Sequence, residues 1–521
     1  KTYINLTRDY AVEQLQSLSR NGFLPAVREL VLHVANNIEP SIDTFHLVCE
    51  LIPQMSGLSV LHWTGAVIPE KVLEYLDKHP QTRLHITVQH ETESTSRADL
   101  HRRQLDLLEK LASDLSGSPD LACLRIDLIN DVSRHSRQLM QGPFKQLLLS
   151  SPALRSLSIN LGQRQGGCVW GRGDPVNDSF GLVRNEAPLN PLQKLEMTGY
   201  YWGMPRYPRP VAEVEYWQRT FDWSQLRRLS LHKASEYMYN SLPLAEFLAP
   251  QLVALEEIEF GDTGFQNDTQ VISNFFSLLP SRKLLSISVP FFIPSWTDIA
   301  AHAATLHSLS IYPSPLTHQQ ILVIRNALPN LSTLTVICDR DDVTESWPYE
   351  SFSLLASIPR LQHLTIWFEI GPHTAPLKPY LTVESAGDIF SQLRGYGAAK
   401  LQRLHMHSGS PPAPFWGKPD LDLYDWRYIN PTSFVCKSKQ DINGNSTCLV
   451  TCTKLSKAEN DRLRRDAARS QGTRCSSPNK WDASNVKCQV ALNGPMSLSE
   501  WVAWRDRIRG EARKGSSWWC M

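Results

Sequence analysis

The stretch LPNLSTLTV (328–336) decides the fold, because its apolar-x-x-Leu-x-apolar pattern returns along most of the chain. Thirteen copies occur, and their first positions lie 22 to 40 residues apart. The Leu-x-apolar half alternates at period two, which predicts a short strand with one buried face. The copies begin at Val27, Leu58, Leu84, Leu121, Leu154, Leu192, Leu226, Leu255, Leu284, Leu306, Leu331, Leu361 and Leu401.

Amphipathic helices are predicted between these strands. Leu105, Leu108, Ala112 and Leu115 follow helical spacing and share one face. Several expected helices stop at a proline just before the next strand, at Pro152, Pro280, Pro329 and Pro359. A strand with a returning helix, repeated about every 30 residues, cannot bury its apolar face alone, so neighbouring repeats must stack. The pattern therefore predicts an α/β solenoid with a parallel sheet on its concave face and helices on its convex face.

The repeat resembles the leucine-rich repeat family. The phrases LPAVRELVLHV (24–34), LPNLSTLTV (328–336) and IPRLQHLTIW (358–367) are similar to the irregular leucine-rich regions of fungal F-box-type proteins, over roughly residues 20 to 407. The family's Asn or Cys after Leu-x-Leu is absent nearly everywhere, and Gly162 and Thr263 stand there in two repeats. We therefore expect the backbone hydrogen bonds of the turn after each strand to be satisfied differently in each repeat. The curvature of the solenoid should then be irregular.

The resemblance implies a protein-binding solenoid whose partner lies on the concave face or rim. It also implies the substrate-recognition part of a ubiquitin-ligase subunit, with the ligase adaptor bound through an N-terminal F-box that is not in this chain. A secreted, disulfide-containing glycoprotein that binds an extracellular protein or glycan is the alternative. An enzyme with a convergent site on the solenoid rim is the third hypothesis.

Charge and cysteine content divide the 521 residues into regions. Residues 451–521 contain 14 Lys/Arg against 7 Asp/Glu, a local charge of +7, so the first 450 residues carry +1 − 7 = −6. We predict an N-terminal capping segment (1–26), the leucine-rich solenoid (27–407), a Pro/Gly-rich linker (408–430) and a small, Cys-rich, basic and partly helical C-terminal module (431–521). Capping boxes at Ser456 and Ser497 predict two helices in this module.

Six of the ten cysteines lie in the last 86 residues, where no histidine follows His407. Disulfides are the favoured interpretation, with free thiols and a cysteine-only zinc site as alternatives. The candidates are Cys436, Cys448, Cys452, Cys475, Cys488 and Cys520. Glycosylation sequons begin at Asn5, Asn177, Asn267 and Asn445, whereas a fifth, at Asn330, is explained by the repeat itself. These features favour secretion, while the F-box resemblance favours the cytoplasm or nucleus.

Two long insertions, at 163–190 and 199–222, leave the same end of their strands and should meet at one rim of the solenoid. Their aromatic and arginine side chains suit a protein-binding hot spot, although the rings could instead pack the loops onto the solenoid. The candidate binding residues on the rim are Trp170, Arg172, Arg184, Tyr200, Tyr201, Trp202, Arg206 and Tyr207. Seven histidines, at 62, 85, 232, 307, 363, 405 and 407, mostly occupy strand positions that point to one face.

Composition and motif searches exclude several classes. A net charge of +1 argues against a chain-wide nucleic-acid or membrane-surface role. No stretch of 18 apolar residues predicts a membrane span. Catalytic, nucleotide-binding and calcium-loop patterns are absent, so the sequence assigns no catalytic residue, metal or cofactor.

Overall fold

The computed structural model covers the whole chain. The structure describes residues 1–6, 11–34, 42–65, 67–91, 98–129, 140–161, 179–198, 200, 213–232, 247–261, 268–280, 283–289, 295–311, 315–338, 346–368, 381, 383–408, 432–440 and 446–454.

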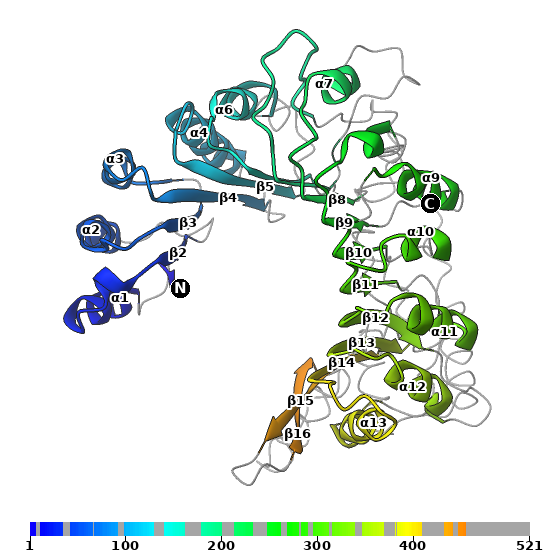
Figure 1. The fold of residues 1–521 in the computed structure, drawn as a ribbon. Coiled ribbons are helices and arrows are strands. Elements are labelled where there is room, and N and C mark those ends of the chain that lie inside the picture. Colours follow the sequence, from blue (N-terminus) through cyan, green and yellow to red (C-terminus); the bar gives the residue numbers. More distant parts are fainter. Residues whose placement is uncertain are drawn as a thin grey trace, which may run out of the picture. The chain divides into compact units, whose positions relative to one another are not determined.

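The described chain alternates strands with helices, and its strands belong to one 16-stranded, mostly parallel sheet in which they follow chain order (Figure 1). This is a solenoid-like α/β fold. The chain divides into two compact units, with the boundary between residues 281 and 282. In each unit the described helices lie on one side of the sheet, which leaves the other strand face free of described helices (Figure 1).

Unit 1 carries the first nine described strands. They are β1 (Thr2–Asn5), β2 (Glu29–His33), β3 (Val60–Thr64), β4 (Arg83–Glu91), β5 (Leu121–Ile129), β6 (Ser156–Asn160), β7 (Lys194–Thr198), β8 (Arg228–His232) and β9 (Glu257–Phe260). Its longer helices are α1 (Ala11–Arg20), α2 (Ile42–Leu51), α3 (Glu70–Lys78), α4 (Ala98–Asp114), α6 (Lys145–Ser150), α7 (Glu213–Arg219) and α9 (Asp268–Leu278). Short turns of helix are η1 (Leu24–Ala26), η2 (Ile52–Gln54), η3 (Met140–Phe144) and η4 (Ala249–Gln251).

Unit 2 carries the remaining strands that the structure describes. They are β10 (Ser286–Ser288), β11 (Ser308–Ser310), β12 (Thr333–Cys338), β13 (His363–Phe368), β14 (Arg403–Ser408), β15 (Thr432–Gln440) and β16 (Ser446–Lys454). Its helices are α10 (Trp296–Ala300), α11 (His318–Ala327), α12 (Tyr349–Ala356) and α13 (Val383–Gly395).

The predicted strands are confirmed, because all thirteen motif copies form strands, β2 to β14. Pairing is parallel from β1 through β9 and again from β10 through β14. The predicted helices around Leu105–Leu115 and before Leu328 correspond to α4 and α11. The helices that precede Pro152, Pro280, Pro329 and Pro359 end two or three residues before the proline.

The leucines of the motif form the core of each unit. The inward residues Leu30, Leu61 and Leu195 are completely buried in unit 1. In unit 2, Leu309 is completely buried and Leu364 is 1% exposed. Burying one such side chain contributes about 2 kcal/mol, so the repeat stabilises the stack through many similar steps.

The backbone just before each strand is tied to the neighbouring repeat in a recurring way. The carbonyl of Gln193, for example, accepts hydrogen bonds from the N–H groups of both Arg227 and Arg228, at 2.8 and 3.0 Å. The same two-donor arrangement occurs in both units at 2.7–3.2 Å, with acceptor carbonyls at Arg28, Arg155, Arg227, Leu285, His307, Ser332 and Gln362. Backbone groups therefore hold successive repeats together in these turns. Asn330 adds a side-chain tie, since its amide donates to Ala304 and accepts from Arg360, at 2.9 and 2.7 Å.

Both ends of the described sheet differ from the sequence expectation. Residues 2–5, within the expected capping segment, form β1, a strand that pairs in parallel with β2. At the other end β14 pairs with β15 in antiparallel fashion, and β15 forms a hairpin with β16. The predicted helices at 456–471 and 497–514 lie outside the described residues. Of the predicted linker (408–430), Ser408 is the last residue of β14, and 409–430 lie outside the described residues.

Candidate functional site

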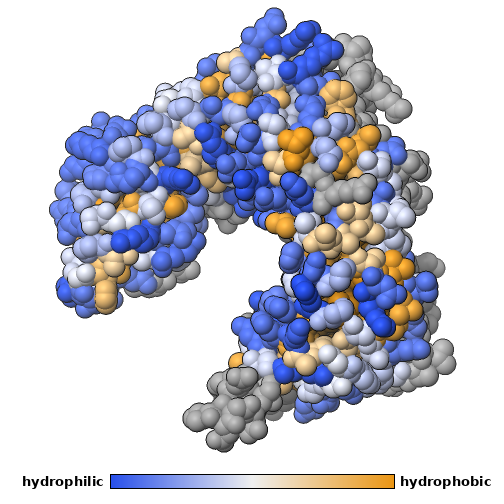
Figure 2. Space-filling view, viewed as in Figure 1, coloured by the Kyte–Doolittle hydropathy of each residue, from blue (hydrophilic) through white to orange (hydrophobic). Residues whose placement is uncertain are grey.

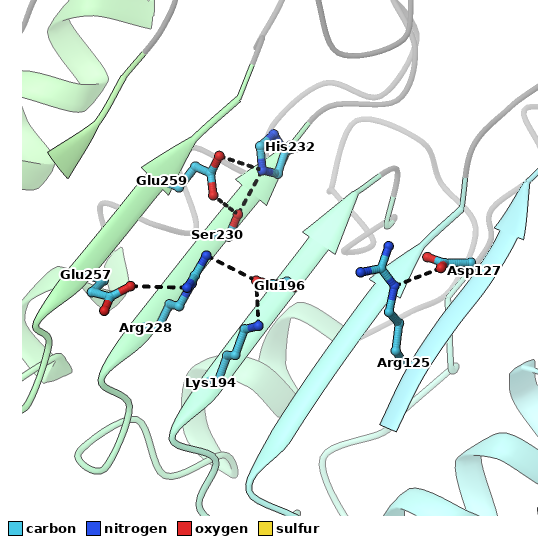
Figure 3. Close-up of polar contacts among 9 residues, drawn as sticks. All are labelled: Arg125, Asp127, Lys194, Glu196, Arg228, Ser230, His232, Glu257 and Glu259. Atoms are coloured by element: carbon cyan, nitrogen blue, oxygen red, sulfur yellow. Dashed lines mark hydrogen bonds and ion pairs between the residues drawn. The ribbon is translucent and has the colours of Figure 1, made fainter. Parts of the chain in front are cut away.

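The strand face of unit 1 that is free of described helices carries charged side chains. Along each strand the leucines point into the core, so the residues between them point to this open face. We call nine residues on β5, β7, β8 and β9 the charged strand face (Figure 3). They are Arg125, Asp127, Lys194, Glu196, Arg228, Ser230, His232, Glu257 and Glu259.

The register of the parallel strands arranges these residues in rows. Lys194, Arg228 and Glu257 are successive partners across β7, β8 and β9. The next row runs from Arg125 on β5 through Ser158, Glu196 and Ser230 to Glu259. The third row runs from Asp127 through Asn160 and Thr198 to His232. Because parallel partners lie about 4.8 Å apart, charges contributed by distant repeats become neighbours.

Ion pairs connect the rows (Figure 3). Arg228 lies between two carboxylates, with its terminal nitrogens 3.6 Å from Glu196 and 3.3 Å from Glu257. Lys194 Nζ is 2.9 Å from the same Glu196 carboxylate oxygen. Each pair at the surface contributes less than about 1 kcal/mol, so the network orients the side chains more than it stabilises the fold.

Two carboxylates of this face are largely shielded from solvent. Burial alone would raise the pKa of Glu196, but hydrogen bonds from Lys194 and Ser158 and the charge of Arg228 bring this pKa below its ordinary value. Asp127 has a side chain only 6% exposed and accepts a hydrogen bond of 2.8 Å from Arg125 Nε. Both carboxylates are therefore held in fixed positions by a cationic neighbour.

Ser230, His232 and Glu259 form a hydrogen-bonded group at one end of the face. Ser230 Oγ lies 2.8 Å from His232 Nε2 and donates to Glu259 Oε2 at 3.1 Å. Since the hydroxyl proton goes to the carboxylate, we assign the Nε2 proton to the histidine, which donates to the hydroxyl. Burial lowers the pKa of His232, and the charges of Glu259 and Glu196 only partly oppose this. The group is therefore arranged to orient side chains, because nucleophilic activation would require Nε2 to accept the serine proton.

A second polar cluster lies on β2, β3 and β4. Glu29 accepts hydrogen bonds from Lys1 Nζ at 2.6 Å and from His62 Nε2 at 2.7 Å. The ring of His62 meets the edge of the His85 ring, with centroids 4.5 Å apart. Burial, together with the neighbouring His62, lowers the pKa of His85 to about 4. His85 is therefore neutral at pH 7.

The open strand face of unit 2 has a different chemistry. β10, β11 and β12 present serine and threonine side chains in register, from Ser286 and Ser308 to Thr333. Beyond them Trp367 on β13 stacks on His407 of β14, with centroids 3.9 Å apart. Ion-paired strand residues of both signs therefore lie on unit 1 at Lys194, Glu196, Arg228 and Glu257. Figure 2 shows many hydrophilic side chains in the region of β4 and β5.

The predicted rim residues have different outcomes. Arg184 is exposed, and its role in binding stays a prediction. Tyr200 is only 5% exposed, and its hydroxyl donates to Glu213 and accepts from the backbone N–H of Phe180. Tyr200 therefore packs its segment onto the solenoid, which was the alternative to a binding role. Trp170, Arg172, Tyr201, Trp202, Arg206 and Tyr207 lie outside the described residues.

Glu213 holds the described part of the first insertion in place. It is the first residue of α7 and is 1% exposed. Besides Tyr200 it accepts from Gly181 N at 3.1 Å and from Trp217 Nε1 at 3.3 Å. Burial raises the pKa of Glu213, although these hydrogen bonds lower it in part. Residues 179–190 are thus docked on unit 1.

Two of the disulfide candidates, Cys436 and Cys448, are free thiols in the structure. Cys452 lies on β16, and Cys475, Cys488 and Cys520 lie outside the described residues. Of the sequons, Asn5 is on β1, and Asn177, Asn267 and Asn445 lie outside the described part.

Six of the seven histidines noted in the sequence lie on the open strand faces. The charged strand face was not predicted from the sequence. His62, His85, His232, His363, His405 and His407 occupy outward strand positions, and His307 precedes β11. The missed signal was the charge of the residues between the motif leucines in the three successive copies that begin at Leu192, Leu226 and Leu255, such as Lys194 and Glu196.

No helix in the described ranges is both long and apolar enough to span a bilayer. Within the same ranges no three His, Cys, Asp or Glu side chains group as metal ligands would. Models of known protein families give no match to this chain, and neither do curated protein sequences.

Proposed function

We propose that this chain is a protein-binding repeat protein and that the charged strand face is its recognition surface. The observation that supports this proposal is the alignment of Arg125, Lys194, Arg228, Glu257 and Glu259 in adjacent rows without a described helix above them. Ion pairs fix these side chains before binding, which lowers the entropy lost when a partner orders them.

A mixed-charge surface of this kind favours a partner with a complementary pattern. Opposite charges steer encounter and fix the orientation of the two proteins, whereas a mismatched pattern juxtaposes like charges. Arginine also contributes strongly to interface hot spots. We therefore expect salt-sensitive binding of a protein that presents both acidic and basic side chains.

The resemblance to fungal F-box-type proteins supports a finer proposal, in which the partner is a substrate captured for ubiquitination. The leucine-rich regions of such proteins hold the substrate, while an F-box contacts the ligase. Under this proposal, partners recovered with the full-length protein should include ligase subunits in addition to the protein that depends on the charged strand face.

The test is partner capture by charge-reversed variants. Lys194→Glu/Arg228→Glu should weaken capture at least about tenfold, since each disrupted charge pair at an interface costs more than about 1 kcal/mol. Partners from extracts of the source cells would be cross-linked, identified by mass spectrometry and then measured one by one with purified protein.

A matched control changes the net charge equally on the helix side of the sheet. Lys71→Glu/Lys110→Glu alters exposed lysines on α3 and α4 and should leave capture unchanged. If both variants lose capture equally, the loss comes from the change in net charge and not from the charged strand face. If the strand-face variant captures the partner as well as the wild type does, the charged strand face is not the recognition surface.

A further inference from the structure

The terminal hairpin packs two cysteines close to helix α13. Cys436 on β15 is completely buried, and its Sγ donates to the backbone carbonyl of Ala386 at 3.4 Å. On β16 a methyl group of Val450 lies 3.5 Å from the position that a side chain at Gly387 would occupy. The hairpin face that contains Cys436 and Val450 is therefore the face against α13.

The strand register places Cys448 on the same face of the hairpin as Cys436. Cys436 is the direct partner of Val450, and Cys448 is the partner of Ser438. Cys436 and Cys448 are thus diagonal neighbours on one face of the hairpin, two residues out of direct register. Cys452, the partner of Phe434, occupies the opposite diagonal.

The two thiols are neighbours on this face. The S–H of Cys436 donates to Ala386, and burial, together with the nearby Cys448, raises the pKa of Cys436. Cys436 is enclosed, whereas Cys448 is exposed and can meet a reagent from solvent. An accessible thiol can attack an external disulfide, and a neighbouring buried thiol can then resolve the mixed disulfide.

We propose that Cys436 and Cys448 form a site of reversible oxidation, at which a disulfide staples β15 to β16. The oxidant is a small-molecule disulfide such as oxidised glutathione. Cys448 thiolate attacks one glutathione sulfur and releases the first glutathione thiol. Cys436 then attacks the Cys448 sulfur and releases the second. Two protein thiols are oxidised, one glutathione disulfide is reduced, and the two protons end on two glutathione molecules.

The environment sets the rate of this exchange. Burial raises the pKa of Cys448, and the neighbouring Cys436 thiol and the charge of Arg394 offset only part of that rise. Burial raises the pKa of Cys436 as well. Both groups are therefore protonated at neutral pH, so oxidation should be slow at pH 7 and faster at pH 8.5.

The staple would act on the end of unit 2. The new bond closes a short loop around the hairpin turn, which restricts the chain when the hairpin opens. We expect backbone amides of β16 to exchange with solvent at least about tenfold more slowly after oxidation, because local opening becomes rarer. Addition of a thiol reductant should restore the original rate.

The experiment uses the full chain, purified reduced and then incubated with oxidised glutathione at pH 8.5. After alkylation of the remaining thiols, peptide mapping should recover a Cys436–Cys448 linkage. Hydrogen exchange measured on the same samples should show the slowing in β16.

Two single variants give the control. Cys452→Ala should keep the linkage and the slowed exchange, while Cys448→Ala should lose both. The melting temperature of reduced Cys448→Ala should stay unchanged, because Cys448 is exposed. Linkage of Cys436 to Cys452 or to another cysteine would overturn the proposal, and so would a stable glutathione adduct on Cys448. None of these outcomes depends on the charged strand face.

Discussion

Gly261 lets the histidine of the charged strand face lie flat against the backbone. An added Cβ at Gly261 would stand 1.9 Å from Nδ1 of His232, well inside contact distance. The imidazole therefore needs a residue without a side chain on the neighbouring strand end. Ser230, only 2% exposed, bonds to that ring, so the position of His232 also fixes the hydroxyl.

Gly261→Ala should displace His232 toward solvent and break its hydrogen bond with Ser230, at a cost of about 1 kcal/mol in folding free energy. The native pKa of His232 lies below its ordinary 6.5 because of burial. The unfolded chain therefore takes up this proton first as pH falls, and stability declines below about pH 6.5. In the variant, folding stability should fall less as the pH drops below about 6.5.

An NMR titration of the His232 ring provides the measurement, with the expectation that its pKa rises in Gly261→Ala. Gly387→Ala is the matched control, since its added Cβ meets Val450 only at an ordinary contact distance of 3.5 Å. An unchanged titration in Gly261→Ala would show that the ring does not depend on the glycine.

Helix α7 depends on a buried carboxyl group at its first residue. Glu213 accepts hydrogen bonds from a tyrosine, a tryptophan and the backbone of the docked segment 179–190. Burial of a carboxyl group is costly, and these donors compensate for the water that it loses. The carboxyl thereby connects the segment before β7 to the helix after it.

Tyr200→Phe should destabilise unit 1 by about 1–3 kcal/mol, because it leaves the Phe180 N–H without its acceptor and removes one donor from Glu213. Urea unfolding monitored by tryptophan fluorescence provides the measurement. Tyr349→Phe, at a tyrosine that is 41% exposed, should cost almost nothing. Equal stability of the two variants would contradict the role assigned to Glu213.

At the scale of the whole molecule, each repeat is stabilised mainly by its neighbours. The described part of unit 2 ends in the β15–β16 hairpin, whose Phe434 is 1% exposed and covers the core beside β14. Unit 1 begins with β1 and β2, whose Leu30 is fully buried. Defects at these two places should therefore have local effects.

Phe434→Ala should cost about 3–5 kcal/mol and Leu30→Ala about 2–5 kcal/mol, as expected for large cavities in a core. Hydrogen exchange should accelerate around β13–β15 in the first variant and around β1–β3 in the second. Acceleration throughout the chain in either variant would show that the molecule opens as a single cooperative body.

The strand positions could be predicted from sequence because the apolar pattern is local. Leu331, Leu334 and Val336 lie within six residues, and all three are buried as the period-two pattern requires. β1 escaped prediction because TYIN lacks the motif and gains its hydrogen bonds from β2. The antiparallel pairing of β15 could not be predicted either, since a local sequence pattern does not specify the neighbouring strand or the direction of pairing.

The sequence by itself determined the solenoid-like alternation of strands and helices, since every repeat carries the information for its own strand. Only the tertiary structure decided which polar side chains meet. Glu196 and Arg228 are 32 positions apart, and only the β7–β8 register makes them neighbours. It also decided that Tyr200 is buried rather than exposed on the rim, because its partner Glu213 belongs to a different element. Contacts between distant segments depend on register and packing, which a single linear pattern does not contain.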